Sequence, residues 1–140
     1  MSEESIISEF ILPNGIKILH KHRPGAIAHL ALMVNTGMRD ELDNENGLAH
    51  FVEHMLFKGT KKRSAKKISQ IFDSIGGQLN AFTGKECTCF YTKALSNYLE
   101  LSVDILSDMF FNSLFSESEI ALEKNVVLEE IDMYEDSPEE

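Results

Sequence analysis

The architecture follows from the segment Gly47-Leu48-Ala49-His50-Phe51-Val52-Glu53-His54-Met55-Leu56-Phe57. Its apolar residues recur at helical spacing, and at about 100° per residue they fall within one arc roughly 140° wide. That stripe predicts an amphipathic helix seated on a core. His50, Glu53 and His54 fall together on the opposite side of the helix. The apolar positions are Leu48, Phe51, Val52, Met55 and Leu56.

The polar face of this helix predicts a metal site. His50 and His54 lie one turn apart, so their imidazoles can share one zinc ion. A carboxylate beside them, that of Glu53, can act on a metal-bound water. The order His-x-x-Glu-His is the reversed zincin motif, and as a bare pattern it is only moderately specific. The alternative is a solvated helix face that happens to carry two histidines and a glutamate.

Length and composition limit the classes of protein. The 140 residues suit one domain, and 43% hydrophobic residues without low-complexity tracts indicate a globular chain. No apolar run approaches the roughly 18 residues of a membrane span, and no signal or transit pattern is visible. We therefore expect a bacterial-type cytoplasmic location and no membrane partner. The net charge of -10 argues against nucleic acid, and we interpret the basic cluster Lys58 and Lys61-Lys62-Arg63 as helix-end electrostatics.

The order of the remaining elements predicts an α+β fold, a mostly antiparallel sheet with helices packed on one face. The strands are indicated by period-two alternation and turn residues, and the helices by caps and apolar spacing. The predicted elements are a hairpin around Asn14-Gly15, a strand over 28–34, a helix from Ser64 to Gly76-Gly77, a hairpin of 78–83 with 87–92, a helix from Ser96 with a buried stripe of Leu99, Val103, Leu106 and Phe110, and a helix from Ile120 to about Tyr134.

The last predicted helix carries an acid against its apolar side. Val126, Val127, Ile131 and Tyr134 predict the apolar seam, and Glu130 lies inside it or at its edge. A carboxylate placed against a core is costly unless it is paired or binds a metal. Two histidines leave a zinc site one protein ligand short, which Glu130 is well placed to supply. The alternative is a border acid paired with a lysine or arginine.

The other histidines and the cysteines have no metal-ligand spacing. His20, His22 and His29 lie in or beside predicted strands, and we expect them to be structural or exposed. Cys87 and Cys89 point to the same face of a strand, where a disulfide between them would be strained. We expect two reduced, packed thiols.

Three separated motifs give the chain a resemblance to a known family. It resembles the pitrilysin or M16 metallopeptidases, which include the mitochondrial processing peptidase β-subunit and many bacterial processing-peptidase-like proteins. The similarity extends from Leu12 to Pro138. In that family a glutamate follows the His-x-x-Glu-His motif about 76 residues on, and Glu130 stands 76 positions after His54. The motifs are Leu48-Ala49-His50-Phe51-Val52-Glu53-His54-Met55-Leu56-Phe57-Lys58-Gly59-Thr60, Gly76-Gly77-Gln78-Leu79-Asn80-Ala81-Phe82-Thr83 and Glu123-Lys124-Asn125-Val126-Val127-Leu128-Glu129-Glu130-Ile131.

The resemblance implies a zinc-dependent endopeptidase with one Zn²⁺ per chain. It implies that a peptide or unfolded protein substrate binds as an added strand, and that a glutamate activates the attacking water. The implied residues are His50, His54 and Glu130 as zinc ligands, Glu53 as general base, Glu123 as a supporting catalytic acid, and Asn80, Ala81 and Phe82 as substrate-binding residues.

The resemblance also implies a larger assembly. Family members run to several hundred residues in paired homologous domains that close over the peptide. Residues 1–140 are therefore expected to be the N-terminal catalytic zinc-binding domain of a longer chain. Its expected partner is a C-terminal homologous domain or a second subunit, and a homodimer is one possible assembly. The piece alone is expected to hydrolyse peptides poorly or not at all.

Two other functions stay open. The S-ribosylhomocysteine lyase family shares the reversed motif, and in that case Cys87 or Cys89 would be catalytic or a ligand. A non-catalytic M16-like subunit is the second alternative. Such subunits typically lose a ligand or the base, whereas all four positions are intact here.

Overall fold

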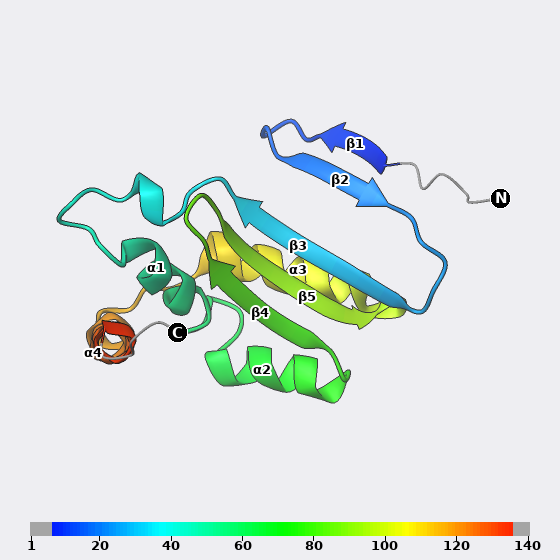
Figure 1. Cartoon of the computed structure of the whole chain (residues 1–140). Coiled ribbons are helices and arrows are strands. Elements are labelled where there is room, and N and C mark those ends of the chain that lie inside the picture. The colour runs from blue at the N-terminus through cyan, green and yellow to red at the C-terminus, as the bar shows by residue number, and fades with distance from the viewer. Residues whose placement is uncertain (1–6, 136–140) are drawn as a thin grey trace.

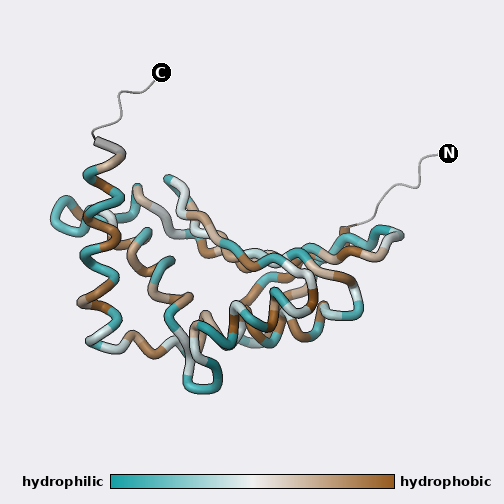
Figure 2. The backbone as a smooth tube through the Cα atoms, turned by 90° about the horizontal axis from the view of Figure 1, so that it is seen from below, coloured by the Kyte–Doolittle hydropathy of each residue, from teal (hydrophilic) through white to brown (hydrophobic). Residues whose placement is uncertain are grey.

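The computed structural model describes residues 7–135, with side chains described as far as residue 133. A three-stranded antiparallel sheet forms the centre of the molecule, and a two-stranded hairpin lies beside it as a separate sheet (Figure 1). The first three α-helices pack on one face of the three-stranded sheet, and the fourth packs chiefly against the first (Figure 2). This arrangement confirms the predicted α+β fold with a mostly antiparallel sheet and helices packed on one face.

The hairpin joins β1 (Ile7–Ile11) to β2 (Lys17–Lys21), and the two strands are antiparallel. Gly15 has a φ of +87°, and its N–H donates to the Leu12 carbonyl at 2.8 Å. A glycine adopts this left-handed conformation without strain. The chain therefore reverses at the predicted Asn14-Gly15 turn.

The main sheet consists of β3 (Ile27–Val34), β4 (Gln78–Thr83) and β5 (Thr88–Leu95). The strand order is β3-β5-β4, so β5 is central and is the most buried strand. β3 alternates between exposed and half-buried residues, as its sequence period predicts. Over residues 7–135, no strand pairs with the outer side of β4.

The four α-helices are α1 (Leu48–Leu56), α2 (Ala65–Ser74), α3 (Leu99–Asn112) and α4 (Glu117–Glu135). Short 3-10 helices at Met38–Asp40 and Ser96–Tyr98 precede α1 and α3. The Ser64 hydroxyl accepts a hydrogen bond from the Lys67 N–H at 3.2 Å, which confirms the predicted cap of α2. None of the helices in the described residues is both long and apolar enough to cross a membrane.

Two clusters of buried apolar side chains join the helices to one another and to the sheet. One cluster links α2 to α3, and the other links α1 to β5 and α3. Burial of a large apolar side chain contributes about 1.5–3 kcal/mol, so this packing fixes the C-terminal end of α1 on the sheet. The clusters are Ile68, Phe72, Ile105 and Met109, and Leu56, Phe90 and Leu106.

The buried face of α3 differs from the predicted stripe. Leu99 and Val103 are 40% and 45% exposed, so the prediction that they are buried is wrong. The helix instead buries Ser102 and Asp108 along with apolar residues. The Ser102 hydroxyl donates to a backbone carbonyl at 3.0 Å, and Asp108 pairs with Arg63. Because both polar groups have partners, α3 can turn them inward.

The apolar sides of α1 and α4 are less buried than their sequences predict. Leu48 is 45% exposed and Val126 is 43% exposed, so neither is a core residue within the described part of the chain. Val127 is buried and Ile131 is half-buried, as predicted. The side chain of Tyr134, the fourth residue of the predicted seam, lies outside the described residues.

An ion-pair network connects α3 with the segment that follows α1. Arg63 Nη1 lies 2.8 Å from Asp108 Oδ2, and Arg63 also pairs with Asp104. The Thr60 hydroxyl donates to Asp108 Oδ2 at 2.6 Å. Burial opposes the ionisation of Asp108, but hydrogen bonds from Thr60, Arg63 and Asn112 outweigh it and lower the pKa of this carboxyl. The interpretation of the basic cluster as helix-end electrostatics is therefore wrong for Arg63.

Candidate metal centre

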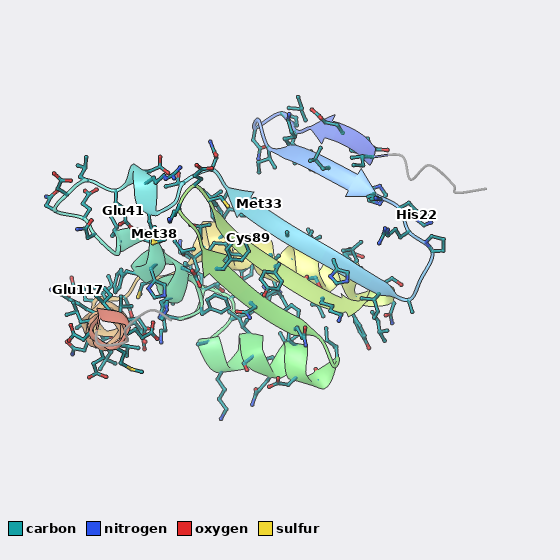
Figure 3. The ribbon with its side chains drawn as sticks, in the orientation of Figure 1. His22, Met33, Met38, Glu41, Cys89 and Glu117 are labelled. Atoms are coloured by element: carbon teal, nitrogen blue, oxygen red, sulfur yellow. The ribbon has the colours of Figure 1, made fainter. Side chains whose placement is uncertain are left out.

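A carboxylate from the preceding loop holds the first turn of α1. Glu41 accepts hydrogen bonds from the Gly47 N–H at 2.9 Å and from the Ala49 N–H at 2.7 Å, and Figure 3 shows Glu41 in that loop. N–H groups at a helix start have no partner within the helix, so Glu41 acts as the cap. His50 lies in the turn that this contact orders. No sequence signal identified Glu41 as this cap, because the two amides lie six and eight residues further along the chain.

Three side chains meet between α1 and α4. His50 Nε2 and His54 Nε2 lie 2.9 Å apart on α1. Glu130 Oε2 of α4 lies 3.7 Å from His50 Nε2 and 3.6 Å from His54 Nε2. All three side chains are half-buried. The structure thus brings together the three residues that the sequence analysis named as metal ligands.

The spacing of these three atoms suits zinc. Their separations of 2.9, 3.6 and 3.7 Å define a triangle whose corners lie on a circle of about 2.0 Å radius, and Zn–N and Zn–O bonds are about 2.0–2.2 Å long. Two imidazoles and one carboxylate form a donor set that zinc prefers. Three protein ligands leave a fourth coordination position open, as in catalytic zinc sites.

Glu123 orients one of the two imidazoles. Its Oε1 accepts a hydrogen bond from His54 Nδ1 at 2.8 Å, and its Oε2 lies 2.5 Å from Lys58 Nζ. An ionised carboxylate can only accept, so Nδ1 carries the hydrogen and Nε2 of His54 is left as the electron-pair donor. Burial opposes ionisation of Glu123, but hydrogen bonds from Lys58 and His54 outweigh it and lower its pKa. The family resemblance implied Glu123 as a supporting acid, but no sequence signal identified Lys58 as its partner.

Glu53, the predicted base, contacts the sheet. The hydroxyl of Thr83, the last residue of β4, donates a hydrogen bond to Glu53 Oε2. Glu53 follows His50 by three residues on α1, and it is not one of the three residues whose ligand atoms converge. The structure therefore joins Glu53 to the end of β4 through Thr83 and leaves it outside the convergent set.

The predicted substrate strand lies at the edge of the sheet. Asn80 and Phe82 of β4 are exposed, and Ala81 between them is half-buried. The Asn80 side-chain oxygen accepts from the Ala81 N–H at 2.9 Å, so that amide points away from β5. A cavity of about 450 Å³ lies between α2 and this strand, and its lining includes Phe57, Asn80 and Tyr91. Backbone groups at such an edge can pair with an added strand.

The remaining histidines and both cysteines do not join the cluster. His20, His22 and His29 are exposed, as expected, and Figure 3 shows His22 on the opposite side of the molecule from α1 and α4. Cys87 and Cys89 are free thiols. Burial and the neighbouring Cys87 raise the pKa of Cys89, which keeps the thiol protonated and makes it a poor nucleophile.

Comparison with known proteins gives a consistent family match. A sequence model described as insulinase, peptidase family M16, matches residues 17–140. The uncharacterized zinc protease YmxG of Bacillus subtilis is 46% identical over 136 residues, which is 96% of this chain and 33% of YmxG. The uncharacterized zinc protease ML0855 of Mycobacterium leprae is 45% identical over 130 residues, which is 92% of this chain and 29% of ML0855.

A solved structure has the same fold. A protease from Helicobacter pylori superimposes with a TM-score of 0.87 at 26% sequence identity, over 90% of this chain and 30% of that protease. The chain therefore spans about a third of the length of the relatives it matches.

Proposed function

Because the chain belongs to peptidase family M16, we propose that it is the N-terminal catalytic, zinc-binding domain of a longer metalloendopeptidase that hydrolyses peptide bonds. One observation carries this proposal: His50 Nε2, His54 Nε2 and Glu130 Oε2 lie 2.9 to 3.7 Å from one another. Nitrogen and carboxylate donors at these separations are the ligands of catalytic zinc sites. The zinc protease names of the relatives support the same metal.

Three residues hold the metal in this proposal, and a fourth does the proton chemistry. His50, His54 and Glu130 would hold the zinc ion, which would supply a Lewis acid for the scissile carbonyl. Glu53 takes a proton from the attacking water and delivers it to the leaving amine. Water therefore adds to the carbonyl carbon, the C–N bond breaks, and Glu53 returns to its carboxylate form.

Two further side chains orient this machinery. The Thr83 hydroxyl donates to one oxygen of Glu53 and leaves the other free to receive a proton. Glu123 accepts the Nδ1 hydrogen of His54 and so presents Nε2 to the metal. Loss of the Thr83 contact would let the base Glu53 rotate, whereas loss of the Glu123 contact would let the ligand His54 rotate.

The substrate in this proposal is a peptide or unfolded protein segment in extended form. It adds to the outer edge of β4, where the Ala81 amide points away from β5 and the side chains of Asn80 and Phe82 are exposed. The cavity beside this strand has room for a side chain of the substrate. A C-terminal homologous domain or a second subunit then closes over the peptide, and a homodimer is one way to supply it.

A Glu53→Gln variant of the intact protein tests the proposal. The amide cannot accept a proton but keeps the size of the side chain, so zinc should remain at one ion per chain while peptide cleavage is lost. Glu129→Gln, an exposed acid on α4, is the matched control and should cleave normally. Retained cleavage in Glu53→Gln would remove Glu53 from its role.

Measurements on the wild-type protein distinguish the peptidase from the two alternative functions, a non-catalytic subunit and a lyase. Zinc binding without any cleavage would favour a non-catalytic subunit. Cleavage that survives alkylation of Cys87 and Cys89 is the result expected of the peptidase, whereas a lyase that uses a cysteine would lose its activity.

A further inference from the structure

A chain of contacts runs from Lys58 through Glu123 to the metal ligand His54. Lys58 follows the C-terminal end of α1, and its Nζ lies 2.5 Å from Glu123 Oε2. The other oxygen of the same carboxylate accepts from His54 Nδ1 at 2.8 Å. Each oxygen of Glu123 thus has its own partner, and the two contacts fix the plane of the carboxylate.

The carboxylate in this chain is deeply buried. Glu123 is 4% exposed, while the side chain of Lys58 is 32% exposed. A buried carboxylate is costly unless a cation or hydrogen-bond donors compensate its charge. His54 is neutral when it binds a metal, so among the described residues Lys58 is the cation that balances Glu123.

Glu123 is also a main contact between α4 and the rest of the described molecule. α4 packs chiefly against α1, and Figure 1 shows it end-on beside that helix. Of its described side chains, Glu123 and Val127 are the buried ones. Glu130 follows Glu123 by seven residues, two turns further along the same helix face. The rotation at which Glu123 docks therefore sets the direction in which Glu130 points.

We propose that Lys58 is a positioning residue for the metal centre, which docks α4 on α1 through Glu123 and thereby presents both His54 Nε2 and Glu130. The inference rests on the proposed zinc site, but the docking itself needs no metal. Lys58 touches neither the ligand atoms nor the substrate in this arrangement.

The direction in which zinc affinity changes when Lys58 is removed distinguishes a positioning role from a purely electrostatic one. A cation near a Zn²⁺ site repels the metal ion, so if electrostatics were the only effect, loss of that cation would tighten zinc binding. Loss of a group that orients ligands weakens binding, typically by about 10- to 100-fold for such outer partners. We expect zinc binding to weaken about tenfold in Lys58→Met, which keeps an unbranched chain of similar length.

Zinc affinity of the intact protein, measured by chelator competition, is the first test. Lys58→Arg keeps the charge and should stay within about threefold of wild type. Lys61→Met removes an exposed lysine from the same segment and should leave affinity unchanged. In a Glu123→Gln background, Lys58→Met should change affinity by less than about twofold, because its partner is gone.

Hydrogen exchange of the α4 amides in metal-free protein is the second test, and it does not depend on zinc. Lys58→Met should speed exchange over residues 117–133 by about tenfold, with circular dichroism showing that the fold is kept. If Lys58→Met does not fold, Lys58→Gln takes its place in both tests, with the same expected directions.

The outcomes separate the inference from the function on which it rests. Unchanged or tighter zinc binding in Lys58→Met, or an equal loss in the Glu123→Gln background, would overturn the role of Lys58 while leaving the peptidase proposal intact. Wild-type protein that binds no zinc through His50, His54 and Glu130 would overturn the proposed function. In that case unchanged α4 exchange in Lys58→Met would overturn the docking role as well, and faster exchange would support it.

Discussion

The Thr83 hydroxyl, at the end of β4, donates a hydrogen bond to the Glu53 carboxylate on α1. Thr83 is half-buried, like Leu79 and Ala81, which alternate with exposed residues along the strand. The strand that we propose to bind substrate is thus joined directly to the group that we propose as the base. A peptide bound along β4 would lie next to the residue that orients Glu53.

We predict that Thr83→Val lowers kcat of the intact protein about tenfold, because a hydrogen bond to a charged group contributes about 1.5–3 kcal/mol and its loss frees Glu53 to rotate. Zinc content should not change, since Thr83 contacts no ligand in the described structure. Thr83→Ser keeps the hydroxyl and should retain activity. Steady-state kinetics with a model peptide measure the effect, and a fully active Thr83→Val would refute it.

Glu130→Gln is predicted to weaken zinc binding by at least about 100-fold, because a neutral amide is a poor substitute for a carboxylate ligand. Glu129→Gln changes the neighbouring exposed acid and serves as the control. Chelator competition measures both affinities. Equal affinities in the two variants would mean that Glu130 is not a ligand.

The Arg63–Asp108 pair is predicted to contribute to the stability of the fold and not to catalysis. Asp108→Asn leaves Arg63 without its buried partner and should lower the free energy of unfolding by about 3 kcal/mol. Asp104→Asn removes the exposed partner of the same arginine and should cost less than about 1 kcal/mol. Urea unfolding compares the two, and similar losses would contradict the assignment.

Acid should destabilise the metal-free protein by protonating the carboxylate of Asp108. The pKa of Asp108 is lowered in the folded state, so the unfolded chain binds the proton more tightly. The contribution of Asp108 is therefore present above the ordinary aspartate pKa and is lost as the pH falls through the folded value, starting below about pH 5.

The Asp108→Asn variant tests that assignment. It should show a flatter decline of the free energy of unfolding between pH 7 and pH 3 than the wild type. Two declines of equal slope would assign the acid sensitivity to other groups. Glu123, whose pKa is also lowered, contributes with the same sign in both proteins.

Local sequence signals predicted most of the secondary structure. The Asn14-Gly15 turn, the Ser64 cap and the hairpin that begins at Gln78 all depend on residues close together in the chain, and the structure has them where they were predicted. The prediction for α3 missed the buried Asp108, because its partner Arg63 lies 45 residues earlier in the chain. Apolar periodicity cannot detect that a buried aspartate will find such a partner.

The candidate site also has a part that local sequence signals predict and a part that depends on the tertiary structure. His50 and His54 are one helical turn apart, so their proximity follows from the helix alone. The prediction of Glu130 depended on the missing third ligand of a zinc site and on the family spacing. No sequence signal pairs Lys58 with Glu123 or Thr83 with Glu53, since a lysine after a helix and a threonine in a strand are ordinary. Only the tertiary structure joins these residues.

The central claim is that α1 and α4 together hold one zinc ion, and anomalous diffraction at the zinc edge from crystals of the intact protein tests it most directly. We predict a single strong peak per chain, about 2.0–2.2 Å from His50 Nε2, His54 Nε2 and a carboxylate oxygen of Glu130. A peak elsewhere, or zinc bound by the two histidines with Glu130 turned away, would contradict the account.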